Sequence, residues 1–260
     1  MGGVRVQWVT PQSGVPPENA GRVLVNLHGG AFVGGAEYCG LVESLPLSHV
    51  GGFRICVVDY RQGWEHRFPA ASEDVAAVVG ELQRTYQPAS IGVFGYSAGG
   101  MLTAQGVPWL LTKGIALPGA LAICSAGAGG TGDSSYLANV AMGSPPAATG
   151  GDDSRAALGS LTAPASFGYA EGVDPTNPLF APIHSADVMA QFPPTLVLTG
   201  TRSFDQSGAL LTHRALLAAG ATAELHAWEG MWHCFPYNHR MPEAKDAFGT
   251  LAGFFDRHLA

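Results

Sequence analysis

Charged residues are scarce in this sequence. Asp, Glu, Lys and Arg make up only 13% of its 260 residues, which is about half of the usual quarter. The chain has 13 Lys and Arg against 20 Asp and Glu, so its formal net charge is −7. Because nucleic-acid binding requires a basic surface, this balance argues against a nucleic-acid partner.

Long hydrophobic runs are lacking as well. No apolar stretch approaches the roughly 18 residues of a transmembrane helix, so we expect no membrane span. The amino-terminal residues 1–5, which read MGGVR, lack the apolar core of a secretory signal. The sequence therefore predicts a cytoplasmic protein.

The four cysteines do not have the sequence spacing of metal ligands. Cys39, Cys56, Cys124 and Cys234 are widely scattered, and none of them belongs to a C-x-x-C pair. Zinc sites use such pairs, and disulfide scaffolds are typical of much shorter secreted chains. No pair of histidines has the helical spacing of a metal site either. We therefore expect space-filling thiols and no metal.

Hydrophobic residues are plentiful by contrast. They form 47% of the chain, enough for a sizeable core, and 36 Gly with 18 Pro predict many turns. Short apolar runs alternate with segments of helical periodicity, which is typical of a mostly parallel, doubly wound α/β sheet with helices on both faces. Ligands of such sheets bind at the carboxyl ends of the strands. The predicted strands are residues 4–9, 23–27, 54–58, 91–94, 120–124, 195–199 and 224–228, and the predicted helices are 72–85, the segment after 97, 207–219 and 242–259.

Two features complete this outline. Ser72 is a plausible N-cap for the first predicted helix. Residues 126–194 break the alternation, because they are rich in Gly, Pro and Ser and show only short helical patches at 134–142 and 154–159. We expect residues 1–260 to form a single domain, with 126–194 as a cap-like insertion above the sheet.

Residues 95–99 read GYSAG and match the pattern G-x-S-x-G. In this pattern the serine occupies a sharp turn between a strand and a helix, and the glycines relieve clashes with both. The match lies between a predicted strand and a predicted helix, as that geometry requires. Ser97 is therefore the candidate nucleophile. The alternative is a glycine-rich turn whose serine caps a helix.

Residues 28–32 read HGGAF and directly follow a predicted strand. Acyl transfer needs backbone N–H groups that point at the developing oxyanion, and small residues let that backbone approach a substrate. The oxyanion-hole candidates are Gly29, Gly30, Ala31 and Ala98, and we expect the amides of the last three to donate. We expect His28 to brace the loop by hydrogen bonds. An ordinary glycine-rich turn is the alternative.

A general base is expected late in the chain if the order is Ser, acid, His. His233 follows the last predicted strand and precedes the last predicted helix, so it belongs at the same edge of the sheet. His239 is the local competitor, whereas His226 falls within a strand.

The acid is expected after the predicted strand 195–199. Asp205 is the first carboxylate available there, and its role would be to fix the imidazole tautomer and stabilise imidazolium. An N-cap for the helix that starts near residue 207 is the competing role. Glu229 is a poorer alternative acid.

Several motifs together resemble a known family. They are residues 28–32 (HGGAF), 59–61 (DYR), 68–74 (FPAASED), 95–100 (GYSAGG), 172–175 (GVDP) with 178–179 (PL), and 229–233 (EGMWH). From about residue 23 to the carboxyl end, the chain resembles the bacterial hormone-sensitive-lipase-like carboxylesterases of the α/β-hydrolase fold.

The resemblance implies hydrolysis of small-molecule esters with short to medium acyl chains, through an acyl-enzyme on Ser97 and with no metal or organic cofactor. It also implies homodimers formed through the last strand of the sheet. The family's acid usually falls at Arg202 or Ser203, so Asp205 would act from two or three residues later. Two alternatives stay open: the same machinery acting on an amide, a lactone or an acetylated substrate, and a non-catalytic small-molecule binder on a hydrolase scaffold.

The family also carries an amino-terminal helical segment that forms part of a cap over the pocket. This chain starts almost at the first predicted strand. We therefore expect a reduced cap, formed by residues 126–194, and a more open pocket.

Overall fold

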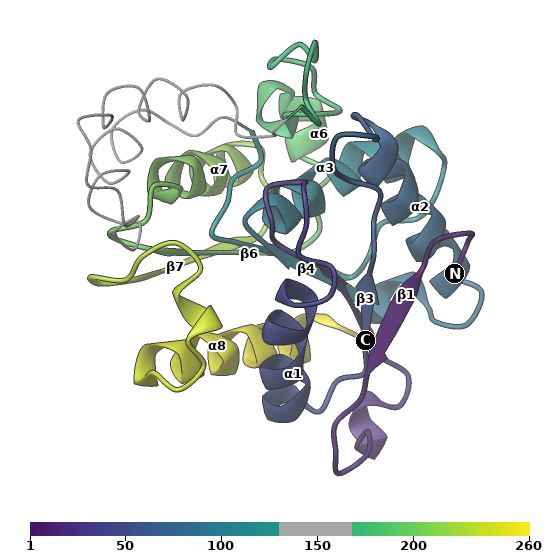
Figure 1. Cartoon of the computed structure of the whole chain (residues 1–260), viewed down its shortest axis with the longest axis vertical. Helices are drawn as coiled ribbons and strands as arrows, with labels where there is room; N and C mark the ends of the chain where they lie inside the picture. The colour runs from purple at the N-terminus through teal and green to yellow at the C-terminus, as the bar shows by residue number, and fades with distance from the viewer. Residues whose placement is uncertain (130–167) are drawn as a thin grey trace.

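A single mixed sheet organises the computed structural model, which describes residues 1–129 and 168–260 (Figure 1). Its seven strands lie in the order β1-β3-β2-β4-β5-β6-β7, and only β1 runs antiparallel to its neighbour. The strands are β1 (Val6–Val9), β2 (Val23–Leu27), β3 (Ile55–Val58), β4 (Ile91–Tyr96), β5 (Ala120–Cys124), β6 (Thr195–Gly200) and β7 (Ala223–Trp228). The predicted α/β fold class is confirmed.

The central strands are buried along their whole length. Every residue of β2, β3, β4, β5 and β6 is buried, because helices cover both faces of the sheet and leave no solvent-facing side that would favour polar residues. The register places Leu27, the last residue of β2, opposite Gly95 of β4. The loops that follow these two strands therefore begin side by side at the carboxyl edge.

Two layers of helices enclose the sheet (Figure 1). On one face α1 (Cys39–Gly51) packs with α8 (Pro242–His258), and on the other lie α2 (Ala70–Leu82), α3 (Ala98–Thr112) and α7 (Gln206–Ala218). Each layer closes its own hydrophobic cluster against the sheet. The remaining elements are α6 (Ala186–Met189) and the 3₁₀ turns η1 (Pro17–Asn19), η2 (Pro88–Ser90), η3 (Pro182–His184) and η4 (Phe235–Tyr237).

Helix α1 was not among the elements that the sequence pattern predicts. It contains Gly40 and Pro46, and its buried residues include the polar Glu43, Ser44 and Ser48. Residues of these types weaken both helix propensity and the apolar stripe on which periodicity arguments depend. The missing prediction matters for the loops at the carboxyl edge, because Glu43 on this helix accepts hydrogen bonds from the Gly29 N–H and the Tyr237 hydroxyl.

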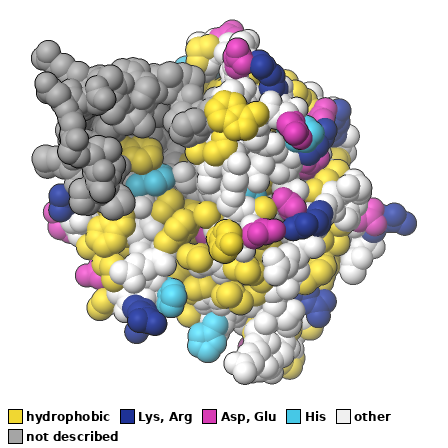
Figure 2. Space-filling view, in the orientation of Figure 1, with side chains coloured by type: hydrophobic (Ala, Val, Ile, Leu, Met, Phe, Trp, Pro, Cys, Tyr) yellow, Lys and Arg dark blue, Asp and Glu magenta, His cyan; other side chains and the backbone are white. Residues whose placement is uncertain are grey.

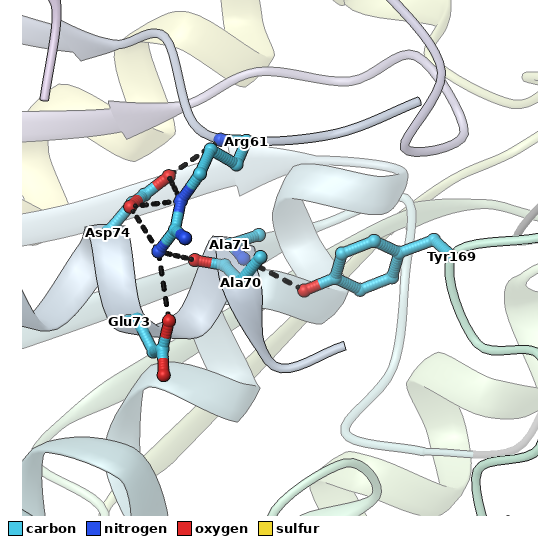
Figure 3. A network of polar contacts seen from close by, with 6 residues as sticks. All are labelled: Arg61, Ala70, Ala71, Glu73, Asp74 and Tyr169. Carbon is cyan, nitrogen blue, oxygen red and sulfur yellow. Dashed lines mark hydrogen bonds and ion pairs between the residues drawn. The ribbon is translucent and has the colours of Figure 1, made fainter. Parts of the chain in front are cut away.

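Helix α2 begins at Ala70, so the predicted N-cap at Ser72 is wrong. Ser72 lies inside the first turn with its side chain buried. The first turn of a helix leaves backbone N–H groups without intrahelical acceptors, and a distant residue supplies one: the Ala71 N–H donates to the Tyr169 hydroxyl oxygen over 3.0 Å (Figure 3). Tertiary structure therefore moves the helix start two residues upstream.

An ion-pair network joins the chain after β3 to the same end of α2 (Figure 3). The Arg61 guanidinium lies 2.8 Å from Asp74 and 2.9 Å from Glu73, and it donates to the Ala70 carbonyl oxygen. The Arg61 backbone N–H also donates to Asp74 over 2.7 Å. The motifs at 59–61 and 68–74 are therefore two halves of one structural joint.

The predicted insertion at 126–194 is only partly visible. Its predicted helical patches, 134–142 and 154–159, lie outside the described residues. Within the described part, Tyr169 is fully buried and η3 and α6 lead the chain into β6.

The described residues include no helix that is both long and apolar enough to cross a membrane. Figure 2 shows one face of the molecule, where acidic and basic side chains lie in small separate groups among hydrophobic ones.

Candidate active site

Ser97 occupies the turn between β4 and α3. Its backbone has φ 55° and ψ −121°, a conformation that residues other than glycine rarely adopt. Close packing of the neighbouring backbone maintains this turn. A Cβ atom on Gly99 would lie 1.7 Å from the Leu27 carbonyl oxygen, and one on Gly95 would lie 2.4 Å from the same atom. Only glycine fits at these two positions, so the packing of α3 against β2 forces the sharp turn that exposes Ser97.

Three predicted side chains form one hydrogen-bonded chain. His233 Nε2 lies 2.9 Å from Ser97 Oγ, and His233 Nδ1 lies 2.7 Å from Asp205 Oδ1. They come from three different loops at the carboxyl edge of the sheet, after β4, β6 and β7. This arrangement lets the imidazole accept the serine proton while the carboxylate holds the opposite N–H.

Asp205 is nearly buried, with 6% of its surface exposed. Its Oδ2 accepts a hydrogen bond from Thr199 Oγ1 over 2.7 Å, and its Oδ1 also accepts one from the Ser203 hydroxyl. Asp205 directly precedes α7, yet its side chain makes no capping hydrogen bond. Of the two roles open to it from the sequence, the geometry favours the one at the imidazole.

The competing histidine positions serve elsewhere. His226 lies on β7 and pairs with Glu224 at 3.2 Å, and His239 is exposed after η4. The ring of His233 stacks on Phe204 with a centroid distance of 4.2 Å. Burial by itself lowers the pKa of His233, but Cys234 and the hydrogen-bonded Asp205 outweigh it, and the net shift of that pKa is upward.

The loop at residues 28–32 has an unusual backbone. Gly30, Ala31 and Phe32 have φ values of 128°, 55° and 60°. The amides of Gly30 and Ala31, like that of Ala98 at the start of α3, have no hydrogen-bond acceptor among the residues that the structure describes. These are the three amides expected to face an oxyanion. The fourth candidate, Gly29, differs, because its N–H donates to Glu43 over 2.9 Å.

His28 supports this loop from below. It is fully buried, its Nδ1 lies 2.7 Å from the Gly29 carbonyl oxygen, and its ring stacks on Tyr60 with centroids 4.3 Å apart. Burial lowers the pKa of His28, which favours the neutral ring. This geometry agrees with the expected bracing role.

Several residues that support the site were missed by sequence reasoning. Glu43 and Tyr237 hydrogen-bond beneath the loop at 2.6 Å, and the ring of Phe32 stacks on Tyr169 with centroids 4.5 Å apart. The only available signal was for Glu43, a carboxylate within the otherwise mostly apolar segment 41–47.

Within residues 1–129 and 168–260, no group of three or more His, Cys, Asp or Glu side chains is placed to hold a metal ion. The four cysteines are free thiols. Three of them, Cys56, Cys124 and Cys234, are buried, and burial raises the pKa of Cys56 to about 12.

A comparison with known families assigns this arrangement. A family described as the alpha/beta hydrolase fold matches residues 24–237. The chain belongs to that family.

This α/β-hydrolase also resembles solved esterases over nearly its whole length. It is 32% identical to the esterase E25, with a TM-score of 0.85, across 99% of this chain and 76% of that one. It is 28% identical to an esterase from the bacterial hormone-sensitive lipase family, with a TM-score of 0.83, across 100% of this chain and 82% of that one. An acetyl-hydrolase from Streptomyces hygroscopicus is 28% identical over 261 residues, which cover 98% of this chain and 80% of the relative. The resemblance predicted from the motifs is confirmed.

Proposed function

We propose that this α/β-hydrolase is a serine carboxylesterase that acts on short- to medium-chain esters through an acyl-enzyme on Ser97. The coarser statement, that the chain is a carboxylic ester hydrolase, follows from its family and from relatives named esterases or acetyl-hydrolases. The observation that carries the finer proposal is the continuous hydrogen-bonded chain from Ser97 through His233 to Asp205.

The first half of the reaction forms the acyl-enzyme. Ser97 Oγ attacks the ester carbonyl carbon while His233 Nε2 takes the hydroxyl proton. Negative charge develops on the carbonyl oxygen, where the N–H groups of Gly30, Ala31 and Ala98 can donate to it. The tetrahedral intermediate then collapses, and His233 returns the proton to the departing alcohol oxygen.

The second half releases the acid. His233 takes a proton from a water molecule, whose oxygen attacks the acyl carbon, and the same amides hold the second oxyanion. Breakdown of this intermediate returns the proton to Ser97 and frees the carboxylic acid. Asp205 keeps the imidazole in the required tautomer through both halves.

The decisive experiment is a chain-length series of p-nitrophenyl esters on the wild type and on Ser97→Ala. We expect the wild type to hydrolyse the acetate and butyrate and the variant to lose on the order of 10⁴–10⁶-fold in kcat. Ser90→Ala is the control, because Ser90 is a buried serine that lies just before β4, at the opposite end of that strand from Ser97. Full activity in Ser97→Ala would refute the assignment.

A fluorophosphonate probe separates the remaining alternatives. Covalent labelling of the wild type but not of Ser97→Ala is the expected outcome, and an unlabelled wild type would favour a non-catalytic binder. A panel of acetyl esters, lactones and acetylated amines then ranks the substrate classes by rate. The panel is needed because hydrolysis of each class would use the same hydrogen-bonded residues.

A further inference from the structure

A carboxyl group is completely buried beneath the oxyanion loop. Glu43 on α1 has no exposed surface, and it accepts hydrogen bonds from Asn26 Nδ2 at 2.7 Å, the Gly29 N–H at 2.9 Å and the Tyr237 hydroxyl at 2.6 Å. Within residues 1–129 and 168–260, no cationic side chain forms an ion pair with it. An acidic group buried without a cation is costly to retain, so its position calls for a role.

One oxygen atom of Glu43 connects two catalytic loops. Oε1 accepts both the Gly29 N–H, from the loop after β2, and the Tyr237 hydroxyl, from the turn that follows His233. The Tyr237 ring also packs on Tyr96, the residue before Ser97, with centroids 5.8 Å apart. A shift of this oxygen would therefore move the oxyanion loop relative to the general base.

The peptide group between His28 and Gly29 is held at both of its ends. Its carbonyl oxygen accepts from the Tyr60 hydroxyl over 2.6 Å, and its N–H donates to Glu43. The carbonyl of the next peptide, that of Gly29, contacts His28 Nδ1 at 2.7 Å. Because a peptide is planar with its N–H opposite its carbonyl, this contact directs the Gly30 N–H away from the imidazole ring.

We propose that Glu43 is a positioning residue of the oxyanion hole, which sets the amides of Gly30 and Ala31 relative to His233 by accepting the Gly29 N–H and the Tyr237 hydroxyl on one oxygen. The residue acts through Gly29 and touches no substrate. The proposal rests on the proposed esterase function, since the hole has a role only in that reaction.

The role depends on hydrogen-bond acceptance rather than on charge. Burial raises the pKa of Glu43 to about 8, although Tyr237, Asn26 and Gly29 each lower it by hydrogen bonding. A glutamine at this position keeps one acceptor oxygen for Gly29 and Tyr237. Its NH₂ group can donate to Asn26 Oδ1, an atom without a partner in the described structure, once the Asn26 amide rotates.

The test compares Glu43→Leu with Glu43→Gln. Leucine leaves the Gly29 N–H and the Tyr237 hydroxyl unpaired, so we expect kcat for p-nitrophenyl butyrate to fall by about 10²-fold while KM changes by less than about threefold. The glutamine variant should keep kcat within about threefold of the wild type. Equal losses in both variants would overturn the argument from acceptance.

A pair of inhibitors provides the readout that a general loss of structure would not give. A trifluoromethyl ketone adds to Ser97 and places an oxyanion in the hole, whereas the matching methyl ketone binds mainly as a ground-state analogue. In Glu43→Leu, the inhibition constant of the trifluoromethyl ketone should rise in proportion to the loss in kcat. The inhibition constant of the methyl ketone should remain unchanged. The proposal would be contradicted if both inhibitors bound more weakly by the same factor, or if the binding of neither inhibitor changed.

Leu47→Ala is the matched control, because Leu47 is also fully buried on α1. It should lower the melting temperature and leave the ratio of the two inhibition constants unchanged. If Glu43→Leu does not fold, Tyr237→Phe removes one of the two donors and should shift the same ratio in the same direction by a smaller factor. A wild type without activity on any ester would instead refute the proposed function.

Discussion

Asp205 reaches the imidazole although it falls two or three residues beyond the position that the family pattern would give the acid. The side chain is held from both sides, with Thr199 donating to one oxygen and Ser203 to the other. Because Thr199 and Gly200 end β6, these contacts fix where the carboxylate lies after the strand. The sequence could nominate Asp205 as the first carboxylate of the loop, but only the loop conformation explains why the later position works.

The pH profile tests this residue. His233 must be neutral to act as a base, and the Asp205 carboxylate favours the protonated imidazole, so activity should be low at acid pH and rise through a pKa above that of a free imidazole. In Asp205→Asn we expect that rise to move to lower pH and kcat to fall by about 10⁴-fold, because the imidazole also loses its tautomer.

Asp246→Asn, at an exposed position on α8, is the control and should leave the profile unchanged. An acid limb that stays in place in Asp205→Asn would show that the carboxylate does not govern the base.

Among the elements, the strands were far easier to predict than helix α1, whose Glu43 contacts the loop at residues 28–32. The buried strands consist mainly of apolar residues, and their alternation with helices along the chain implies a parallel sheet. Helix α1 has its buried face interrupted by Glu43, Ser44 and Ser48, so no apolar stripe marks it. The residues that carry chemistry could be proposed from motifs, whereas their supports could not, because the contacts of Glu43 depend on segments up to 194 residues away.

Two glycine-to-alanine substitutions test the strand-to-helix turn. In Gly99→Ala the new Cβ would collide with the Leu27 carbonyl oxygen at 1.7 Å, so α3 must shift and carry Ser97 with it. We expect a loss of about 10²-fold or more in kcat, together with lower stability.

Gly249→Ala is the matched substitution in another helix, where a Cβ meets nothing within 4 Å. It should raise the free energy of unfolding by about 0.5–1 kcal/mol and leave kcat unchanged. Urea denaturation and initial rates on p-nitrophenyl butyrate measure both effects. An active Gly99→Ala variant would show that the contact between α3 and β2 does not shape the turn.

On the scale of the whole molecule, the candidate site lies at the carboxyl edge of the sheet, and the hydrophobic packing around Phe255 lies away from that edge. Phe255 of α8 is fully buried and packs edge-on against Phe94 and Phe53, with centroids 6.3 Å and 6.4 Å apart. It also lies against Gly92, which is five residues before Ser97 and so about 16 Å away along an extended strand.

Phe255→Ala should therefore affect folding and not catalysis. We expect the free energy of unfolding to fall by about 3–5 kcal/mol, as measured by urea denaturation. The value of kcat per active site, titrated with the fluorophosphonate probe, should remain within about twofold of the wild type. A change in KM for the butyrate ester would indicate that the two edges of the sheet are coupled.

The contacts of Tyr169 limit where the segment that links β5 to β6 can be exchanged for that of another protein. Its hydroxyl accepts a hydrogen bond from the Ala71 N–H at the start of α2 (Figure 3). Its ring stacks on Phe32 of the loop at residues 28–32. Although Tyr169 falls within the predicted insertion at residues 126–194, it packs against α2 and the loop at residues 28–32. A chimera that imports this segment from another esterase should therefore rejoin the host chain before Tyr169, because a junction placed after it would remove a support of the loop that the graft was meant to leave intact.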